Sequence, residues 1–104
     1  MRKADEALEF LAETDDEAAQ AKAYVEWTES KKKTTLATLM ANLSGSIAHR
    51  KMTAEADSQY AEACTEARDA VYEYEKIRNM RKSAELEFEY WRTVSANKRA
   101  GQLV

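Results

Sequence analysis

The fold is decided by residues 58–100, which read SQYAEACTEARDAVYEYEKIRNMRKSAELEFEYWRTVSANKRA and contain neither Gly nor Pro. Apolar or small residues recur in steps of three and four, at Tyr60, Ala63, Ala67, Ala70, Tyr74, Ile77, Met80, Ala84, Phe88 and Trp91. This spacing places them on one side of an α-helix, so it predicts a single helix of about 40 residues, roughly 60 Å long. The preceding residues must supply the surface that buries this stripe.

The composition favours an all-α fold. Of the 104 residues, 34% are charged and 44% are hydrophobic, and the chain has two Gly and no Pro. Long charged helices with narrow apolar stripes have this balance, whereas a β fold needs more turn residues and a disordered chain has fewer apolar ones. The length predicts a single helical domain, residues 1–104.

Three further helices are expected before residue 58. A short amphipathic helix is predicted at 3–13, and a second at 15–43, because Thr14 followed by Glu17 matches a capping box; the first helix could also run into the second with only a bend. Gly45 can close the second helix, and Ser46 can cap a third at 47–56. Asp57 or Ser58 then caps the long helix at 58–100.

Two long helices joined by a short corner predict an elongated, coiled-coil-like antiparallel hairpin. If Leu43 lies opposite Ser58, position i faces roughly position 101 minus i. On this register the acidic stretch Asp15–Glu29 lies along Tyr72–Leu86, which contains several cations. Charge and topology agree, although exposed ion pairs are each worth only about 0–1 kcal/mol.

The charges are segregated along the chain. The net charge is −8 over Asp5–Glu29, +5 over Lys31–Lys51 and +4 over Lys76–Arg99. Cations accompanied by aromatic residues can contact phosphates and stack a base. The candidate nucleic-acid-binding residues are Lys31, Lys32, Lys33, Arg50, Lys51, Arg78, Arg81, Lys82, Arg92, Lys98 and Arg99. The bland alternative is that acidic residues across the hairpin neutralise many of them.

Large apolar residues also fall outside the stripes that form the hairpin: Phe10, Tyr24, Trp27, Tyr72, Leu86, Tyr90 and Val94. Exposed apolar area of this extent usually marks an association surface, so we expect a homo-oligomer, most simply a two-fold dimer. The candidate interface residues are Trp27, Tyr60, Tyr74, Ile77, Phe88 and Trp91.

Catalytic, metal and membrane functions find little support. One histidine, His49, and one cysteine, Cys64, cannot assemble a zinc set, and no phosphate-binding glycine loop is present. We expect no enzyme activity, cofactor, metal or small-molecule substrate. The uncharged run between Lys33 and His49 is shorter than the ~20 residues a spanning helix needs. No secretory signal is visible, so a cytoplasmic protein with a buried thiol is expected.

Residues 36–100 resemble a group of small helical proteins from tailed phages and prophages. The similar segments are Ser44–Arg50, Asp57–Ala63, Arg81–Glu85, Trp91-Arg92 and Ala96–Arg99. Members of that group tend to be encoded among recombination and replication genes and have no assigned enzymatic activity. The resemblance therefore implies a phage accessory protein acting near DNA metabolism in a bacterial host, and it transfers no functional residues.

The combined expectation is a non-enzymatic accessory factor of DNA recombination or replication that self-associates and binds DNA or a recombination protein. Two alternatives remain open. The acidic residues 5–29 could imitate a DNA backbone and inhibit a host nuclease, or the chain could be a purely structural coiled-coil adaptor.

Overall fold

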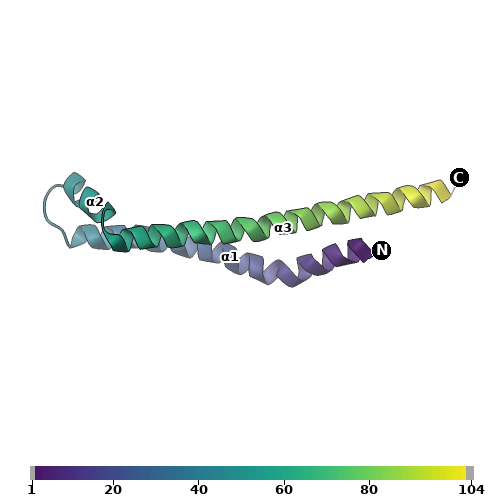
Figure 1. The fold of residues 1–104 in the computed structure, drawn as a ribbon, viewed down its shortest axis with the longest axis horizontal. Helices are drawn as coiled ribbons and strands as arrows, with labels where there is room; N and C mark the ends of the chain where they lie inside the picture. Colours follow the sequence, from purple (N-terminus) through teal and green to yellow (C-terminus); the bar gives the residue numbers. More distant parts are fainter. Residues whose placement is uncertain (1, 103–104) are drawn as a thin grey trace. The chain divides into compact units, whose positions relative to one another are not determined.

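The computed structural model describes residues 2–102, all of whose regular structure is helical. Helix α1 spans Arg2–Ala41, α2 spans Ile47–Glu55 and α3 spans Ser58–Gln102 (Figure 1). The all-α class, the hairpin pairing of the long helices and the long C-terminal helix are therefore confirmed.

Of the two alternatives for residues 3–43, separate helices at 3–13 and 15–43 are wrong and a first helix that runs on into the second is confirmed, because α1 is continuous through Thr14. A capping box would need the Thr14 side chain to accept from the backbone N–H of Glu17. Instead, the Thr14 hydroxyl donates to the carbonyl oxygen of Phe10, one turn earlier, at 2.7 Å. Thr14 is also buried, at 8% exposure. Its hydroxyl is thus satisfied inside a continuous helix, so the helix has no reason to end there.

The corner between the long helices forms where the sequence predicts it, although the helix before it ends at Ala41 and not at 43, so that Gly45 lies in the loop and does not directly close the helix. Gly45 has a φ of 108°, a backbone conformation that residues with a Cβ rarely adopt. The Ser46 side chain accepts from the backbone N–H of His49 at 3.2 Å and caps α2. The Asp57 carboxylate accepts from the backbone N–H of Gln59 at 2.7 Å at the start of α3. A side-chain acceptor therefore satisfies one backbone N–H in the first turn of each helix.

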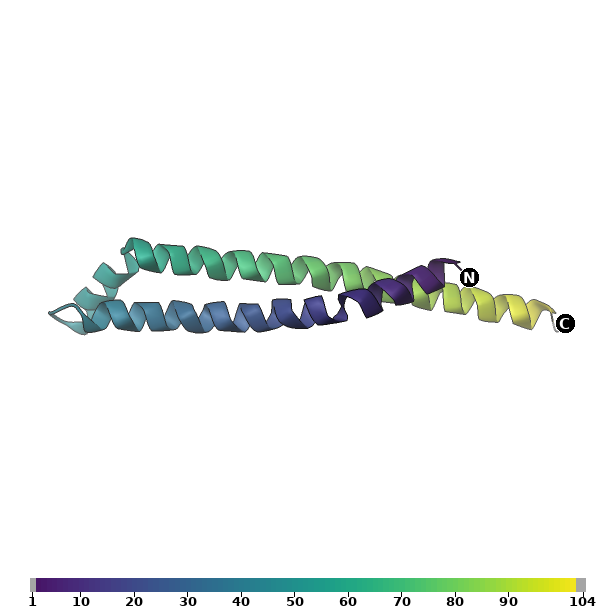
Figure 2. The same ribbon diagram turned by 90° about the horizontal axis from the view of Figure 1, so that it is seen from below.

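The chain divides into two compact units, each of which pairs a segment of α1 with a segment of α3. The first unit joins the part of α1 up to Ala19 to the part of α3 from Glu75. The second unit is Gln20–Tyr74 and contains the remaining parts of both long helices together with α2 (Figure 2).

In both units the seam between α1 and α3 follows a seven-residue repeat with alternating steps of three and four. The buried or half-buried seam positions on α1 are Ala4, Ala7, Leu11, Thr14, Ala18, Ala21, Val25, Thr28, Lys32 and Thr35. Those on α3 are Tyr60, Ala63, Ala67, Ala70, Tyr74, Ile77, Arg81, Ala84, Phe88 and Trp91. The pattern is that of an antiparallel coiled coil whose most buried residues are chiefly alanine and threonine.

One seam position differs from the prediction. The stripe was expected to include Met80, which is 49% exposed, and the adjacent Arg81 occupies the seam. The seven-residue repeat explains the difference, since the steps from Ile77 lead to Arg81 and Ala84. The polar head group of Arg81 is accommodated there because it finds hydrogen-bond acceptors on α1.

The helices are antiparallel, but the predicted register is wrong. In the second unit, the predicted register places Tyr24 opposite Ile77. Tyr24 instead donates a hydrogen bond to Glu66, which lies much earlier in α3. In the same unit, Leu39 and Gln59 line one hollow, so α3 begins beside Leu39 and not beside Leu43. The reason is the corner, where α2 and its flanking turns separate the end of α1 from the start of α3.

The first unit shows the same shift. Arg81 contacts Leu11, Thr14 and Asp15, whereas the predicted register places it opposite Gln20. Lys3 lies over the ring of Trp91, so the last turns of α3 extend beyond the start of α1 (Figure 2).

Candidate functional site

Lys31, the first residue of the lysine run, is held in a cluster of side chains on the second unit. Its ammonium group lies 2.9 Å from a carboxylate oxygen of Glu66 and 5.0 Å from the centroid of the Trp27 ring. Tyr24 donates its hydroxyl to the other oxygen of Glu66 at 2.9 Å. The rings of Tyr24 and Trp27 stack at 5.7 Å with 19° between their planes. Lys31 is therefore engaged by both a carboxylate and an aromatic face.

These contacts shift the protonation of the cluster. Hydrogen bonds from Lys31 and Tyr24 hold the pKa of Glu66 below its ordinary value, because both stabilise the carboxylate. The hydrogen bond between Tyr24 and Glu66 also raises the pKa of Tyr24, because ionisation of the phenol would remove the proton that it donates to Glu66. The cluster is consequently most complete when Glu66 is charged and Tyr24 is neutral.

Lys32 lies in the seam, half-buried, and not on an outward face. Its ammonium group is 3.3 Å from a carboxylate oxygen of Glu29, and this hydrogen bond raises the pKa of Lys32. On α3, where Tyr60 and Cys64 lie one turn apart, a hydrogen bond with Cys64 raises the pKa of Tyr60. Cys64 is a free, half-buried thiol. Lys32 is thus committed to contacts within the chain.

Arg81 makes three hydrogen bonds across the seam of the first unit. One guanidinium nitrogen donates at 2.7 Å both to the carbonyl oxygen of Leu11 and to the hydroxyl of Thr14. The other donates to a carboxylate oxygen of Asp15 at 3.2 Å. Its side chain is only 19% exposed. Arg81 therefore links the two helices, and few of its N–H donors remain accessible to a phosphate.

The remaining candidate cations are of three kinds: two are paired with a carboxylate, one is half-buried and the others are exposed. Arg78 pairs with Glu75 at 3.2 Å and Arg92 with Glu89 at 2.8 Å, each one turn away on α3. Arg50 is half-buried, and its Nε has no hydrogen-bond partner in the structure. The exposed candidates are Lys33 and Lys51 in the second unit and Lys82, Lys98 and Arg99 in the first. Five of the eleven candidates, namely Lys31, Lys32, Arg78, Arg81 and Arg92, therefore have a carboxylate partner already.

The candidate interface residues occupy two kinds of position. Five of them lie in the seam within the chain: Tyr60, Tyr74, Ile77, Phe88 and Trp91. Trp27 points outward and is 53% exposed. Among the other large apolar residues outside the predicted stripes, Tyr24, Tyr72, Leu86 and Tyr90 are exposed, while Phe10 and Val94 are half-buried.

Two hollows flank the stacked rings of Tyr24 and Trp27. The first, about 650 Å³, lies against Tyr24 and is lined on α3 by Ala61, Glu62, Thr65, Glu66, Asp69 and Ala70, among others. The second, about 460 Å³, lies against Trp27 and Lys31 and is lined by Ser30, Thr34, Thr35, Thr38, Leu39 and Gln59. The first is called the acidic hollow below, and Tyr24, Trp27 and Lys31 together the aromatic ridge.

Sequence reasoning did not single out Glu66 or the acidic hollow. The signal that could have found Glu66 is the seven-residue repeat of each helix. Tyr24, Lys31 and Glu66 all hold the position just before the first seam residue of a repeat, and such positions face each other in an antiparallel coiled coil. Without the register, however, the repeat gives several possible partners.

Over residues 2–102, no three His, Cys, Asp or Glu side chains are grouped so that they could hold a metal ion. In the same residues, no helix combines the length and apolar character needed to cross a membrane. Comparisons with protein families, curated proteins and solved structures found no match to the chain. The geometry therefore carries the functional argument.

Proposed function

We propose that this chain is a non-enzymatic helical interaction protein that acts by self-association and by contact with other proteins. The observation that carries the proposal is that small residues fill the buried seam while several large apolar side chains are exposed to solvent. The most buried seam positions are chiefly alanine and threonine, whereas Trp27, Tyr72, Leu86 and Tyr90 are 53–64% exposed. Large exposed aromatic side chains are the groups that dominate the energetics of protein interfaces.

A protein partner is favoured over DNA because of how the cations are used. Lys32 and Arg81 are bonded to acidic residues within the chain, and Arg78 and Arg92 to neighbours on α3. A phosphate would have to displace these partners, and counterion release rewards only cations that reach the nucleic acid. The setting that the resemblance implies, a phage or prophage factor of DNA recombination or replication in the bacterial cytoplasm, is part of the same proposal.

Sedimentation equilibrium over a hundredfold range of protein concentration tests self-association. The proposal expects a reversible mass increase to at least a dimer. Binding of single- and double-stranded oligonucleotides across a salt series tests the rival. Salt-sensitive binding that is lost when Arg92, Lys98 and Arg99 are changed to Ala, in a chain that stays monomeric, would replace the proposal with direct DNA binding.

A further inference from the structure

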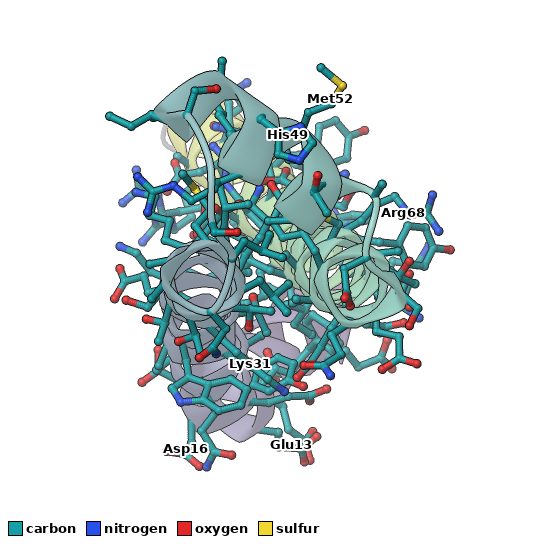
Figure 3. The ribbon with its side chains drawn as sticks, turned by 90° about the vertical axis from the view of Figure 1, so that its left-hand side faces the viewer. Glu13, Asp16, Lys31, His49, Met52 and Arg68 are labelled. Carbon is teal, nitrogen blue, oxygen red and sulfur yellow. The ribbon has the colours of Figure 1, made fainter. Side chains whose placement is uncertain are left out.

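The second unit leaves one face of its helix pair open. Figure 3 shows His49 and Met52 of α2 on one side of the unit, while Lys31 points out on the opposite side. The aromatic ridge and both hollows belong to the same unit as Lys31. α2 therefore covers one face of the α1–α3 pair, and the ridge projects from another.

The part of α1 around the ridge is suited to burial. A row of exposed, uncharged residues runs along it, namely Ala23, Trp27, Ser30, Thr34 and Thr38, with Lys31 on one side of the row and the exposed Glu26 and Lys33 on the other. An exposed helix face that lies in water ordinarily carries more charge than this. A face of small and aromatic residues packs closely against another helix, because its short side chains leave room for large ones.

The α3 side of the same unit has the opposite charge. The acidic hollow has Ala61, Thr65 and Ala70 in its lining, and Glu62 and Asp69 line it as well. A complementary occupant must carry a large apolar group that fills the hollow together with a cation that meets these carboxylates. The aromatic ridge offers both, in Trp27 and Lys31.

We propose that the occupant of the acidic hollow is the aromatic ridge of a second copy of this chain. One face thus carries both the aromatic ridge and the acidic hollow, whose charges are complementary. A two-fold, isologous contact requires this, because the same face of each copy must fit the other. Each copy inserts Trp27 into the other's hollow, and Lys31, already paired with Glu66 of its own chain, gains Glu62 and Asp69 across the interface. This inference rests on the proposed self-association and names the face that performs it.

Trp27→Glu tests the contact in the full-length protein. Trp27 is 53% exposed and is not a seam position, so the variant should keep its helical circular dichroism. We expect the dimer dissociation constant to rise about thirtyfold or more, as when an aromatic hot spot is removed. Met52→Glu is the matched control, since Met52 is 70% exposed on the side covered by α2 and its change should leave the dimer intact.

A second pair of measurements is independent of changes to the ridge. The double variant Glu62→Lys/Asp69→Lys places cations opposite Lys31, so it should weaken the dimer about tenfold at low salt and less at high salt. In Trp91→Phe, which leaves Trp27 as the only tryptophan, fluorescence emission should move to the blue as protein concentration increases.

The outcomes separate the two proposals. A dimer that survives Trp27→Glu and both lysine substitutions would overturn this face while leaving self-association in place. A wild-type chain that stays monomeric throughout would overturn self-association and this inference together. Oligonucleotide binding that Trp27→Glu abolishes in a monomeric chain would also overturn it, by assigning the ridge to nucleic acid.

Discussion

Arg81 of α3 donates to the hydroxyl of Thr14 of α1 at 2.7 Å, inside a seam whose other members in this unit are apolar. The hydroxyl in turn donates to Phe10 at 2.7 Å, so one threonine links the cation to the backbone of α1. Alanine-rich seams pack at several registers almost equally well, because successive alanines are interchangeable. A polar contact with one good partner distinguishes the native register from a slip by one repeat.

Removal of this link should destabilise the chain measurably. Arg81→Ala leaves the Thr14 hydroxyl and the Asp15 carboxylate without their donor, and the expected loss is about 1.5–3 kcal/mol, the range for hydrogen bonds to charged groups. Urea unfolding followed by circular dichroism measures it. Arg78→Ala is the control, since Arg78 is exposed and pairs with Glu75 on its own helix, so its cost should stay below about 1 kcal/mol. Equal losses in the two variants would mean that Arg81 does not stabilise the seam.

The close packing of the seam can be tested by adding volume. Ala7 is buried at 4% exposure, so Ala7→Leu must push α1 and α3 apart locally, with an expected cost of about 1–3 kcal/mol. Ala12, on the same helix, is exposed, and Ala12→Leu should change stability by less than about 0.5 kcal/mol. Thermal unfolding of both variants checks the difference. Tolerance of leucine at Ala7 would show that the seam is looser than the structure has it.

The two glycines should respond in opposite directions to alanine. Gly45 has a φ of 108°, and a Cβ there would lie 3.3 Å from Cδ2 of His49, so Gly45→Ala should cost about 1–2 kcal/mol. Gly101 lies in α3, and among the described residues an added Cβ would meet no atom within 4 Å beyond its chain neighbours and the surrounding helix backbone. Gly101→Ala should therefore be neutral or stabilise by up to about 1 kcal/mol through helix propensity. Chemical denaturation measures the change in unfolding free energy for each variant. A loss of stability in both would contradict the conformational difference between the two glycines.

The Glu66 cluster should make stability depend on pH at the acidic end. The pKa of Glu66 is lowered in the folded chain, so the folded state binds this proton less readily than the unfolded state does. Its stabilising contribution is complete above the ordinary value of 4.5 and is lost as the pH falls through the lowered folded pKa. The difference in unfolding free energy between wild type and Glu66→Gln should therefore shrink on acidification from pH 7.

Lys31 provides the control for that titration. A Lys31→Met background removes the Lys31 hydrogen bond, which is the main cause of the lowered pKa of Glu66, so the Glu66→Gln difference should vary less with pH. NMR titration of the Glu66 carboxyl in both backgrounds gives the same comparison directly. If the titration midpoint of Glu66 were the same in the Lys31→Met background, the Lys31–Glu66 ion pair would not be the cause of the lowered pKa.

Much of the fold could be predicted from the sequence because its signals are local. The unbroken three-and-four spacing of residues 58–100 predicts α3, and Gly45, Ser46 and Asp57 predict the corner. The predicted break at Thr14 failed because a threonine side chain can cap a new helix or bond back to the preceding turn with the same atoms. Only the burial of Thr14 against α3 decides between these two hydrogen bonds.

The candidate site was less predictable. Lys31, Lys32 and Lys33 are adjacent in sequence, yet one lies against Trp27 and Glu66, one lies in the seam and one is exposed. A helix turns by about 100° per residue, so neighbours in a lysine run face different surroundings. Which surroundings they meet depends on the register of α3, and the sequence alone gave the wrong one.

The sequence by itself determined that this protein is helical, where its corner lies and which faces are apolar, because helix propensity, capping and periodicity act within a few residues. Only the tertiary structure decided that Arg81 replaces Met80 in the seam, that Glu66 pairs with Lys31, and that the exposed Trp27 lines a hollow. Those outcomes depend on the register between two helices far apart in sequence, and the short-range terms that form each helix do not fix that register.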